Sequence, residues 1–400
     1  MPKSAFKATI DYNGVIMKFS CNKDALIKEI GAASKVVSQK NSISIISNVV
    51  LIANGESLTI KATDAKVWFE TQMPVVVEKE GEIAIYCDKF LNILRALPSG
   101  NLIFTTTGEQ LEIVPEKKAT INVALRYQAT DSFPVTTEAP AAAFFRLPQR
   151  SFLTMREHTI FSVSTEETRI FVNGVYMEKK EDKLVMVSTD AKRLSYIDSS
   201  PENEVANFNG VIIPPKFLNL VKDLAYGEGE IALAIVDKTI YAHFDNVKIS
   251  SALIDGQFPN YAKVIPQSFG YQLKFNRAEF LETLKLAANM SDNKSQNRIF
   301  FTLDENKVVV KSAESKEGEI RQEINTTYTK LDEAAEDLTK APIIMALNHK
   351  FLSEPLLAMD TKEFSVNFSN DSAPIKVSPI YEDEAKAINY FHIIMPMQVD

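Results

Sequence analysis

The chain has 400 residues, 45% of them hydrophobic and 24% charged, with a net charge of −8 at pH 7. This is the composition of an ordinary globular protein with chain enough for two or three domains. Two cysteines, Cys21 and Cys87, are too few for a disulfide framework or a thiolate metal site and favour a reducing compartment. The sequence has neither an uncharged apolar run near the ~20 residues of a membrane span nor a signal-peptide core, so we expect a cytoplasmic protein.

The first third of the chain predicts a helix, strands, a second helix and further strands. Apolar residues recur at helical spacing over 23–37. Short β-branched runs follow, and Asn54-Gly55 marks a hairpin between two of them. Asp88 is the expected N-cap of a helix over 88–97, which Pro98 helps to end.

The same order recurs twice more along the chain. Helices are predicted over 148–163, 215–225, 276–289 and 348–359, with β-branched strands between them. Pro214-Pro215 starts the second of these four, and Pro355 is expected to kink or shorten the last. Each third therefore offers two amphipathic helices and antiparallel strands, an α+β arrangement.

Short sequences also recur at one interval. "KATDAKVWF" at 61–69 returns as "VSTDAKRLS" at 187–195, and Phe133-Pro134 returns as Phe258-Pro259. Lys-Phe-Leu opens three of the predicted helices, starting at residues 89, 216 and 350. These matches indicate three copies of a unit of about 125 residues, far longer than a solenoid repeat.

The predicted helices carry more positive charge than the chain around them. They hold twelve Lys and Arg against eight Asp and Glu, whereas the whole chain holds 44 against 52. One interpretation is that these are ordinary solvated faces. The other is a surface that meets a polyanion while the rest of the protein repels it.

Motifs of catalysis are missing from the sequence. It has no P-loop, G-x-G-x-x-G, H-E-x-x-H, C-x-x-C or G-x-S-x-G motif, and its four histidines lack ligand spacing. The recurring Thr-Asp pairs are expected to cap turns through side-chain hydrogen bonds. The balance favours a binding scaffold; the alternative is an enzyme or small-molecule binder built on triplicated α+β domains.

Several segments in order resemble the bacterial replicative sliding clamp, the β subunit of DNA polymerase III. They are "ISNVVL" followed by "ATD", then "STDAKRL", "DGQFPNY" and the closing "IIMPMQV". The resemblance covers about 17–400. It implies three clamp domains per chain and a head-to-tail homodimeric ring of six domains around duplex DNA, with helices lining the hole. It implies no catalytic residue, no metal and no cofactor.

The resemblance divides the chain into residues 17–139, 140–264 and 265–400. Residues 1–16 precede Met17-Lys18-Phe19, which fits the usual start of the family, so they are either an extension or the product of a misplaced start codon.

The resemblance also implies a groove that binds short linear peptides from the polymerase catalytic subunit, the clamp loader, other polymerases and repair proteins. The matching positions are Val172, Thr189, Ala191, Lys192, Arg193, Leu194, Pro259, Lys263, Val264, Asn348, Phe351, Ile394, Met395, Pro396, Met397, Gln398 and Val399. Ala191, Lys192 and Gln398 depart from the family's usual Gly, His and Arg. Pro396 suggests an edge position for the last segment.

Two further sets of residues follow from the same resemblance. The residues expected to contact DNA without sequence readout are Lys40, Lys89, Arg169 and Lys216. The residues expected at the dimer seam are Met290, Thr120 and Asn122, with an edge strand near 119–125.

Overall fold

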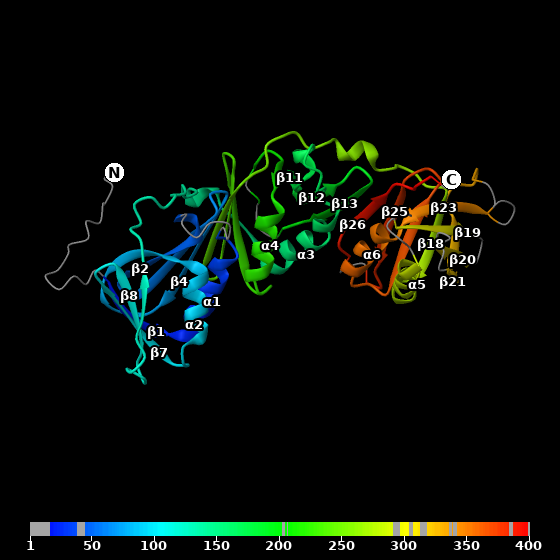
Figure 1. Cartoon of the computed structure of the whole chain (residues 1–400). Coiled ribbons are helices and arrows are strands. Elements are labelled where there is room, and N and C mark those ends of the chain that lie inside the picture. The colour runs from blue at the N-terminus through cyan, green and yellow to red at the C-terminus, as the bar shows by residue number, and fades with distance from the viewer. Residues whose placement is uncertain are drawn as a thin grey trace. The chain divides into compact units, whose positions relative to one another are not determined.

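The computed structural model describes residues 17–37, 45–201, 205, 207–290, 297–303, 307–312, 318–335, 338, 342–383 and 387–398. The chain forms two compact units. Unit 1 comprises Met1–Gln149 and Lys216–Leu253, and unit 2 comprises Arg150–Pro215 and Ile254–Asp400. The middle third of the chain thus contributes to both units (Figure 1).

All six predicted helices are found among the described residues. They are α1 (Lys23–Ser34), α2 (Cys87–Ala96), α3 (Gln149–Glu157), α4 (Pro215–Leu224), α5 (Arg277–Met290) and α6 (His349–Ala358). None of these described helices is long and apolar enough to cross a membrane.

The helix ends differ from the prediction in three places. Asp88 is not the N-cap of α2, because the N-cap is Tyr86, whose side chain makes no capping hydrogen bond. Asp88 lies in the first turn, where its negative charge interacts favourably with the helix dipole. The helix predicted over 148–163 ends at Glu157, and a 3₁₀ turn follows at Ile160–Ser162. Pro355 does not end α6, which continues to Ala358.

Unit 1 contains two antiparallel sheets. The five-stranded sheet has the order β5-β1-β7-β8-β9 and consists of β1 (Lys18–Asn22), β5 (Val76–Lys79), β7 (Asn101–Thr107), β8 (Gln110–Pro115) and β9 (Val123–Arg126). The eight-stranded sheet has the order β10-β15-β16-β17-β4-β3-β2-β6 and consists of β2 (Asn48–Asn54), β3 (Ser57–Thr63), β4 (Val67–Pro74), β6 (Gly81–Tyr86), β10 (Phe145–Pro148), β15 (Glu230–Val236), β16 (Thr239–Phe244) and β17 (Val247–Ala252).

Unit 2 repeats this plan with a nine-stranded and a four-stranded sheet. The first has the order β14-β11-β12-β13-β26-β25-β24-β18-β22 and consists of β11 (Val175–Lys180), β12 (Lys183–Thr189), β13 (Arg193–Ser199), β14 (Val211–Ile213), β18 (Tyr271–Asn276), β22 (Thr327–Lys330), β24 (Glu363–Phe368), β25 (Ile375–Ile380) and β26 (Tyr390–Ile394). The second has the order β21-β20-β19-β23 and consists of β19 (Arg298–Leu303), β20 (Lys307–Ser312), β21 (Arg321–Asn325) and β23 (Ile343–Asn348).

The strand orders show the threefold repeat directly. Three half-sheets share one pattern, β6-β2-β3-β4, β14-β11-β12-β13 and β23-β19-β20-β21. In the long sheets, the last strand of such a half-sheet pairs with the last strand of the following repeat, β4 with β17 and β13 with β26. By the same rule, β21 of the third repeat and β9 of the first repeat have no such partner among the described strands, and each lies at the edge of its sheet.

The cores follow the predicted periodicity. Leu26 and Ile30 of α1 and Phe152 of α3 are fully buried, and Phe280 of α5 is only 2% exposed. Helix α1 packs on α2 and on strands β3 and β4. Truncating a fully buried Phe such as Phe152 to Ala costs about 3–5 kcal/mol, so these helix faces fix the helices on the sheets.

Candidate functional site

The Thr-Asp turn between β12 and β13 is the best-defined polar element of the site. Asp190 Oδ1 accepts hydrogen bonds from the backbone N–H of Lys192 (3.0 Å) and of Arg193 (3.1 Å). Thr189 Oγ1 accepts from Ala191 N–H at 3.1 Å and donates to the Arg193 carbonyl at 2.6 Å. Ala191 has a φ of 71°, a conformation that suits glycine better, which accounts for the family's usual Gly.

The corresponding turn in unit 1 has the same bonds. Asp64 Oδ1 accepts from Lys66 N–H (2.9 Å) and Val67 N–H (2.7 Å), and Ala65 has a φ of 72°. Both Thr-Asp pairs therefore cap turns, and the prediction of a structural role is confirmed. The turn at Asp64 also forms with a valine in the place that arginine holds in unit 2.

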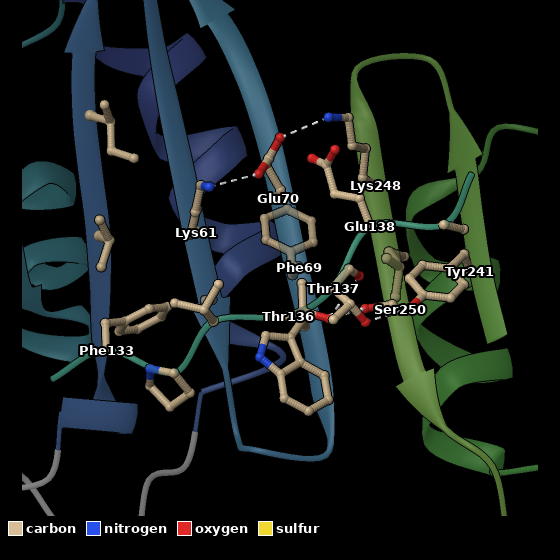
Figure 2. A pocket seen from close by; sticks show the side chains of 18 of the residues that line it. Lys61, Phe69, Glu70, Phe133, Thr136, Thr137, Glu138, Tyr241, Lys248 and Ser250 are labelled. Atoms are coloured by element: carbon tan, nitrogen blue, oxygen red, sulfur yellow. Dashed lines mark hydrogen bonds and ion pairs between the residues drawn. The ribbon is translucent and has the colours of Figure 1, made fainter. Parts of the chain in front are cut away.

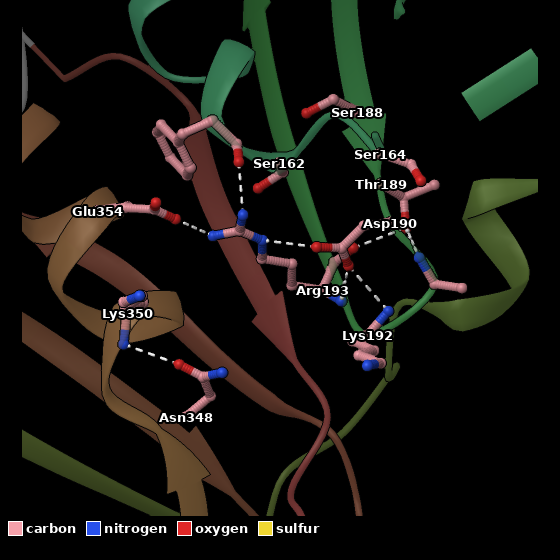
Figure 3. A network of polar contacts seen from close by, with 12 residues as sticks. Ser162, Ser164, Ser188, Thr189, Asp190, Lys192, Arg193, Asn348, Lys350 and Glu354 are labelled. Carbon is pink, nitrogen blue, oxygen red and sulfur yellow. Dashed lines mark hydrogen bonds and ion pairs between the residues drawn. The ribbon is translucent and has the colours of Figure 1, made fainter. Parts of the chain in front are cut away.

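Arg193 is the centre of a polar network in unit 2 (Figure 3). Its guanidinium donates to Asp190 Oδ2 at 3.0 Å, to the Phe161 carbonyl at 2.5 Å and to the Glu354 carboxylate. Its charge also lies 4.4 Å from the centre of the Phe351 ring. With only 10% of its side chain exposed, Arg193 holds Phe351 and the loop at Phe161 in fixed positions.

A buried chain of polar groups supports this network. His392 Nδ1 lies 3.0 Å from Ser195 Oγ, which lies 2.6 Å from Ser162 Oγ, next to the carbonyl that Arg193 binds. Burial, together with the charges of His158 and Arg193, holds the pKa of His392 well below its usual value. His392 is therefore neutral at pH 7 and can serve as a hydrogen-bonding partner without adding charge.

An apolar cluster borders the network. Val172 and Leu194 are buried in one cluster with Phe258, the residue before Pro259. Tyr196 and Tyr261 pack on its side, and Tyr261 begins the 3₁₀ turn Tyr261–Val264. Next to the buried cluster the surface stays apolar, because Val264 is 54% and Met395 42% exposed.

The C-terminal segment crosses this region. Strand β26 is an interior strand between β13 and β25, with Arg193 opposite Ile394. Beyond it, Met395 N–H donates to the Lys192 carbonyl at 2.9 Å and Met397 N–H to the Ala346 carbonyl at 2.8 Å. The suggestion of an edge position from Pro396 is wrong, because the strand is interior and ends before the proline, which lies where no ladder bond is required.

The remaining groove positions lie around this centre. Asn348 is the N-cap of α6, and its side chain accepts from Lys350 N–H at 2.9 Å. The exposed positions are Ala191, Lys192, Pro259, Lys263 and Gln398. Val399 lies outside the described residues. The contacts of Phe161 and Glu354 with Arg193 were not predicted. The residues that flank Phe161 and Glu354 in the sequence give no sign that either contacts a turn more than thirty residues away.

The basic charge of the helices is concentrated in unit 1. Its helices α1, α2 and α4, with the residue that caps α1, expose the basic side chains Lys28, Lys35, Lys89, Arg95, Lys216 and Lys222. The acidic residues exposed on the same helices are Asp24 and Asp223. Lys35 pairs with Asp223 at 2.9 Å and Lys28 lies 5.1 Å from the ring centre of Tyr226, so α1 and the end of α4 are neighbours.

The four expected DNA contacts have different surroundings. Lys89 is exposed in the first turn of α2. Lys216 pairs with Asp64 at 2.6 Å and donates to the Val36 carbonyl at 3.2 Å. Arg169 pairs with Glu166 at 2.7 Å in unit 2. Lys40 lies outside the described residues.

The expected seam residues are placed only in part. Strand β9 is the edge strand near 119–125, but it begins at Val123, so Thr120 and Asn122 are exposed residues of the turn before it. Met290 is the last residue of α5, and its side chain lies outside the described part of the structure. Among the described residues, no group of three or more His, Cys, Asp or Glu is arranged to hold a metal ion.

Three α+β repeats with joined antiparallel sheets and basic helices define the DNA-clamp class. Models of the DNA polymerase III beta subunit match most of the chain: its N-terminal domain at residues 17–137, its central domain at 146–260 and its C-terminal domain at 262–398. The beta sliding clamp of Treponema pallidum is 37% identical over 388 residues, 96% of this chain and 100% of the relative. The chain belongs to the beta sliding clamp family.

Other similarities agree with this assignment. The beta sliding clamp of Rickettsia bellii is 27% identical over 389 residues, 96% of this chain and all of the relative. The structure of the Bacillus subtilis sliding clamp has a TM-score of 0.87 at 20% identity, covering 96% of this chain and 100% of that one. The DNA polymerase III beta subunit of Borrelia burgdorferi, solved with a natural product, has a TM-score of 0.84 at 24% identity, covering 96% and 98%. The chain is therefore a sliding clamp of DNA replication and a non-catalytic subunit of DNA polymerase III.

Proposed function

We propose that two copies of this chain close head to tail into a six-domain ring around duplex DNA. The observation that carries the proposal is the pair of unmatched sheet edges, β9 and β21. Within the chain, the equivalent strands pair, as β4 with β17 and β13 with β26. Pairing β21 of one copy with β9 of the other would continue the rule and remove both exposed edges.

In this ring the clamp domains are residues 17–139, 140–264 and 265–400. Met290, Thr120 and Asn122 would lie at the seam beside the two edge strands. Residues 1–16 lie outside the described part of the structure and have no role in the proposal. A clamp that acts on chromosomal DNA would work in the cytoplasm, at the nucleoid.

The basic helices of unit 1 would face the DNA. Phosphates would attract exposed Lys89 directly, whereas Lys216 would first have to release Asp64. The contacts are sequence-independent, because they involve phosphates and not base edges. Lys40 and Arg169 are kept as candidate contacts from the family resemblance alone.

The groove around Arg193 would hold short linear peptides of the polymerase catalytic subunit, the clamp loader, other polymerases and repair proteins. Its support is the combination of an exposed apolar rim, at Val264 and Met395, with side chains held rigidly by Arg193. A rigid apolar groove with a few polar groups binds peptides at a low entropic cost.

The ring can be tested by loading the chain on DNA and measuring retention. With the family's clamp loader and ATP, a topological clamp remains on nicked circular DNA and is lost when the circle is cut once. Equal retention on circular and linear DNA would show a groove binder instead. Sedimentation provides the control, since a chain that is monomeric at micromolar concentration cannot close the ring.

A further inference from the structure

Residues 258–264, the connecting segment, contribute three exposed positions to the groove around Arg193. These are Pro259, Lys263 and Val264. Among the described contacts, no backbone hydrogen bond joins the connecting segment to a strand. The C-terminal segment, in contrast, is bonded to its neighbours through its own backbone. The position of the connecting segment therefore depends on its side chains.

Tyr261 makes the one described hydrogen bond from the connecting segment to the sheet. Its hydroxyl donates to Glu178 Oε1 of β11 at 2.5 Å. The Tyr261 ring lies 6.3 Å from the Tyr176 ring and 6.1 Å from the Tyr196 ring, so it packs beside both. Tyr261 is also the first residue of the 3₁₀ turn that ends at Val264. Fixing Tyr261 on the sheet therefore fixes the start of the turn that presents Val264.

Glu178 accepts from two tyrosines, one on each carboxylate oxygen. Besides the bond from Tyr261, the Tyr176 hydroxyl donates to Glu178 Oε2 at 3.1 Å. The Tyr176 ring stacks on the ring of Phe258 at 4.8 Å. The carboxylate thus binds one residue of the connecting segment directly and orients the ring on which another residue packs. No described cation pairs with Glu178, so the two phenols are its partners in this part of the structure.

The surroundings of the two phenols keep them protonated. Burial, together with the hydrogen bond to Glu178 and its charge, raises the pKa of Tyr261 well above the ordinary value. Burial, and then the charge of Glu178, raises the pKa of Tyr176 to about 12. Both hydroxyls therefore remain donors at neutral pH. Hydrogen bonds from a hydroxyl to a carboxylate are shorter and stronger than those between neutral groups, and the bond from Tyr261 is of this kind.

Unit 1 has no counterpart of this carboxylate. When the two sheets are aligned at their Thr-Asp turns, Val50 of β2 takes the position of Tyr176 and Ile52 takes that of Glu178. Neither of these side chains can accept a hydrogen bond. The strand junction beside them also differs, because it carries the ion pairs of Glu70 where unit 2 has stacked aromatic rings.

The segment that crosses the sheet of unit 1 is held by pairs of hydroxyls instead (Figure 2). Three residues after the start of the Phe-Pro pair, it has Thr136 where unit 2 has Tyr261. Thr136 Oγ1 lies 3.5 Å from Ser250 Oγ, and Thr137 Oγ1 lies 3.2 Å from the Tyr241 hydroxyl. A cavity of about 340 Å³ lies between this segment and the sheet. Covering the sheet therefore does not require a tyrosine bound to a carboxylate, which occurs in the repeat that has the groove.

We propose that Glu178 is a positioning residue of the groove around Arg193. Through the Tyr261 hydroxyl, its carboxylate holds the connecting segment on the sheet and keeps Lys263 and Val264 in the arrangement that a peptide meets. Glu178 is not itself one of the groove positions. The role rests on the proposed binding of peptides by the groove. A side of the groove that is formed in advance spares the peptide the entropic cost of ordering it.

Tyr261→Phe tests the hydrogen bond alone, because it keeps the ring and removes the hydroxyl. The probe is a fluorescein-labelled peptide with the clamp-binding motif of the polymerase catalytic subunit, and its affinity, measured by fluorescence anisotropy, should fall about tenfold. The matched control is Tyr196→Phe, which removes a hydroxyl that donates to Asp198 at 3.1 Å on the same face of the sheet. Asp198 keeps its bond from Lys183, so the control should bind the peptide like the wild-type chain.

Two substitutions of Glu178 separate its hydrogen bond from its bulk. Glu178→Ile introduces the residue of unit 1 and removes the acceptor, so it should weaken binding at least as much as Tyr261→Phe. Glu178→Gln keeps an oxygen that can accept, so part of the affinity should return. Combining Glu178→Ile with Tyr261→Phe should cause no greater loss than Glu178→Ile alone, since both changes remove one bond.

The possible outcomes distinguish this role from the groove itself. If the wild-type chain does not bind the peptide, the groove is not a peptide site and the role of Glu178 is refuted as well. If the wild-type chain binds and Tyr261→Phe binds equally well, the groove stands and the positioning role is refuted. Additive losses in the double variant would also contradict the role, because the two side chains would then act separately. Melting curves establish that each variant folds; if Glu178→Ile does not, the result for Tyr261→Phe decides.

Discussion

Replacing Arg193 by valine would test whether the polar network shapes the peptide groove. Valine is the residue at the equivalent position of unit 1, where the turn at Asp64 keeps both backbone hydrogen bonds. The turn at Asp190 should therefore survive the substitution. What is lost is the set of contacts that the guanidinium makes with Asp190, Glu354, Phe161 and Phe351.

The magnitude follows from those contacts. Losing the partner of the half-buried Phe161 carbonyl costs about 1–3 kcal/mol. The pair with Glu354, whose side chain is 38% exposed, adds at most about 1 kcal/mol. Because such terms are not additive, we expect about 2 kcal/mol of lost stability, or a melting temperature roughly 4–8 °C lower.

The affinity for peptides should fall together with the stability. Phe351 and the 3₁₀ turn at Phe161 lose the group that holds them, and the affinity for a labelled clamp-binding peptide should fall by more than about tenfold. Fluorescence anisotropy measures the affinity, and sedimentation of the same samples should show an unchanged dimer. Unchanged peptide affinity in a folded Arg193→Val protein would refute the role given to Arg193.

Three further outcomes are expected. Replacing Lys89 and Lys216 by Gln should flatten the dependence of DNA affinity on salt by up to about 0.9 per lost phosphate contact, with the larger part from Lys89, because Lys216 is paired with Asp64. Deleting residues 397–400 removes a wall of the groove and should abolish peptide capture with the dimer intact, as anisotropy and sedimentation would show. Burial lowers the pKa of His158 from 6.5 to about 4, so as the pH falls the unfolded state takes up the proton at a higher pH than the folded state does. The free energy of unfolding should therefore fall by roughly 3 kcal/mol between pH 6.5 and 4. Urea unfolding of His158→Phe should show a flatter pH dependence.

The sequence predicted the helices well because their apolar residues recur at a strong helical period. The apolar faces at Leu26, Phe152 and Phe280 are buried as expected. Helix ends were predicted less well, since capping is decided by local geometry. Tyr86 precedes α2 as a residue of strand β6, and this sheet pairing fixes the helix start without a side-chain cap.

The local turns of the site were predicted from the sequence, but the contacts between residues far apart in the sequence were not. The recurrence of Thr-Asp correctly indicated a turn cap, because the bonds involved span only two to four residues. The pairing of Arg193 with Glu354 joins residues 161 positions apart, and no local pattern contains it. Lys216 was expected from the sequence to contact DNA, and only the fold shows that it pairs with Asp64, 152 positions away.

The sequence by itself determined the number of repeats, their α+β class and the family, because periodicity and short motifs are properties of neighbouring residues. Only the tertiary structure decided how the repeats join, since pairing β4 with β17 and β13 with β26 depends on which strand edges meet. It also decided that equivalent junctions have different chemistry, stacked rings at Tyr196 and a charged row at Glu70. Cross-strand neighbours come from segments more than a hundred residues apart, so their packing is fixed only when the sheet forms.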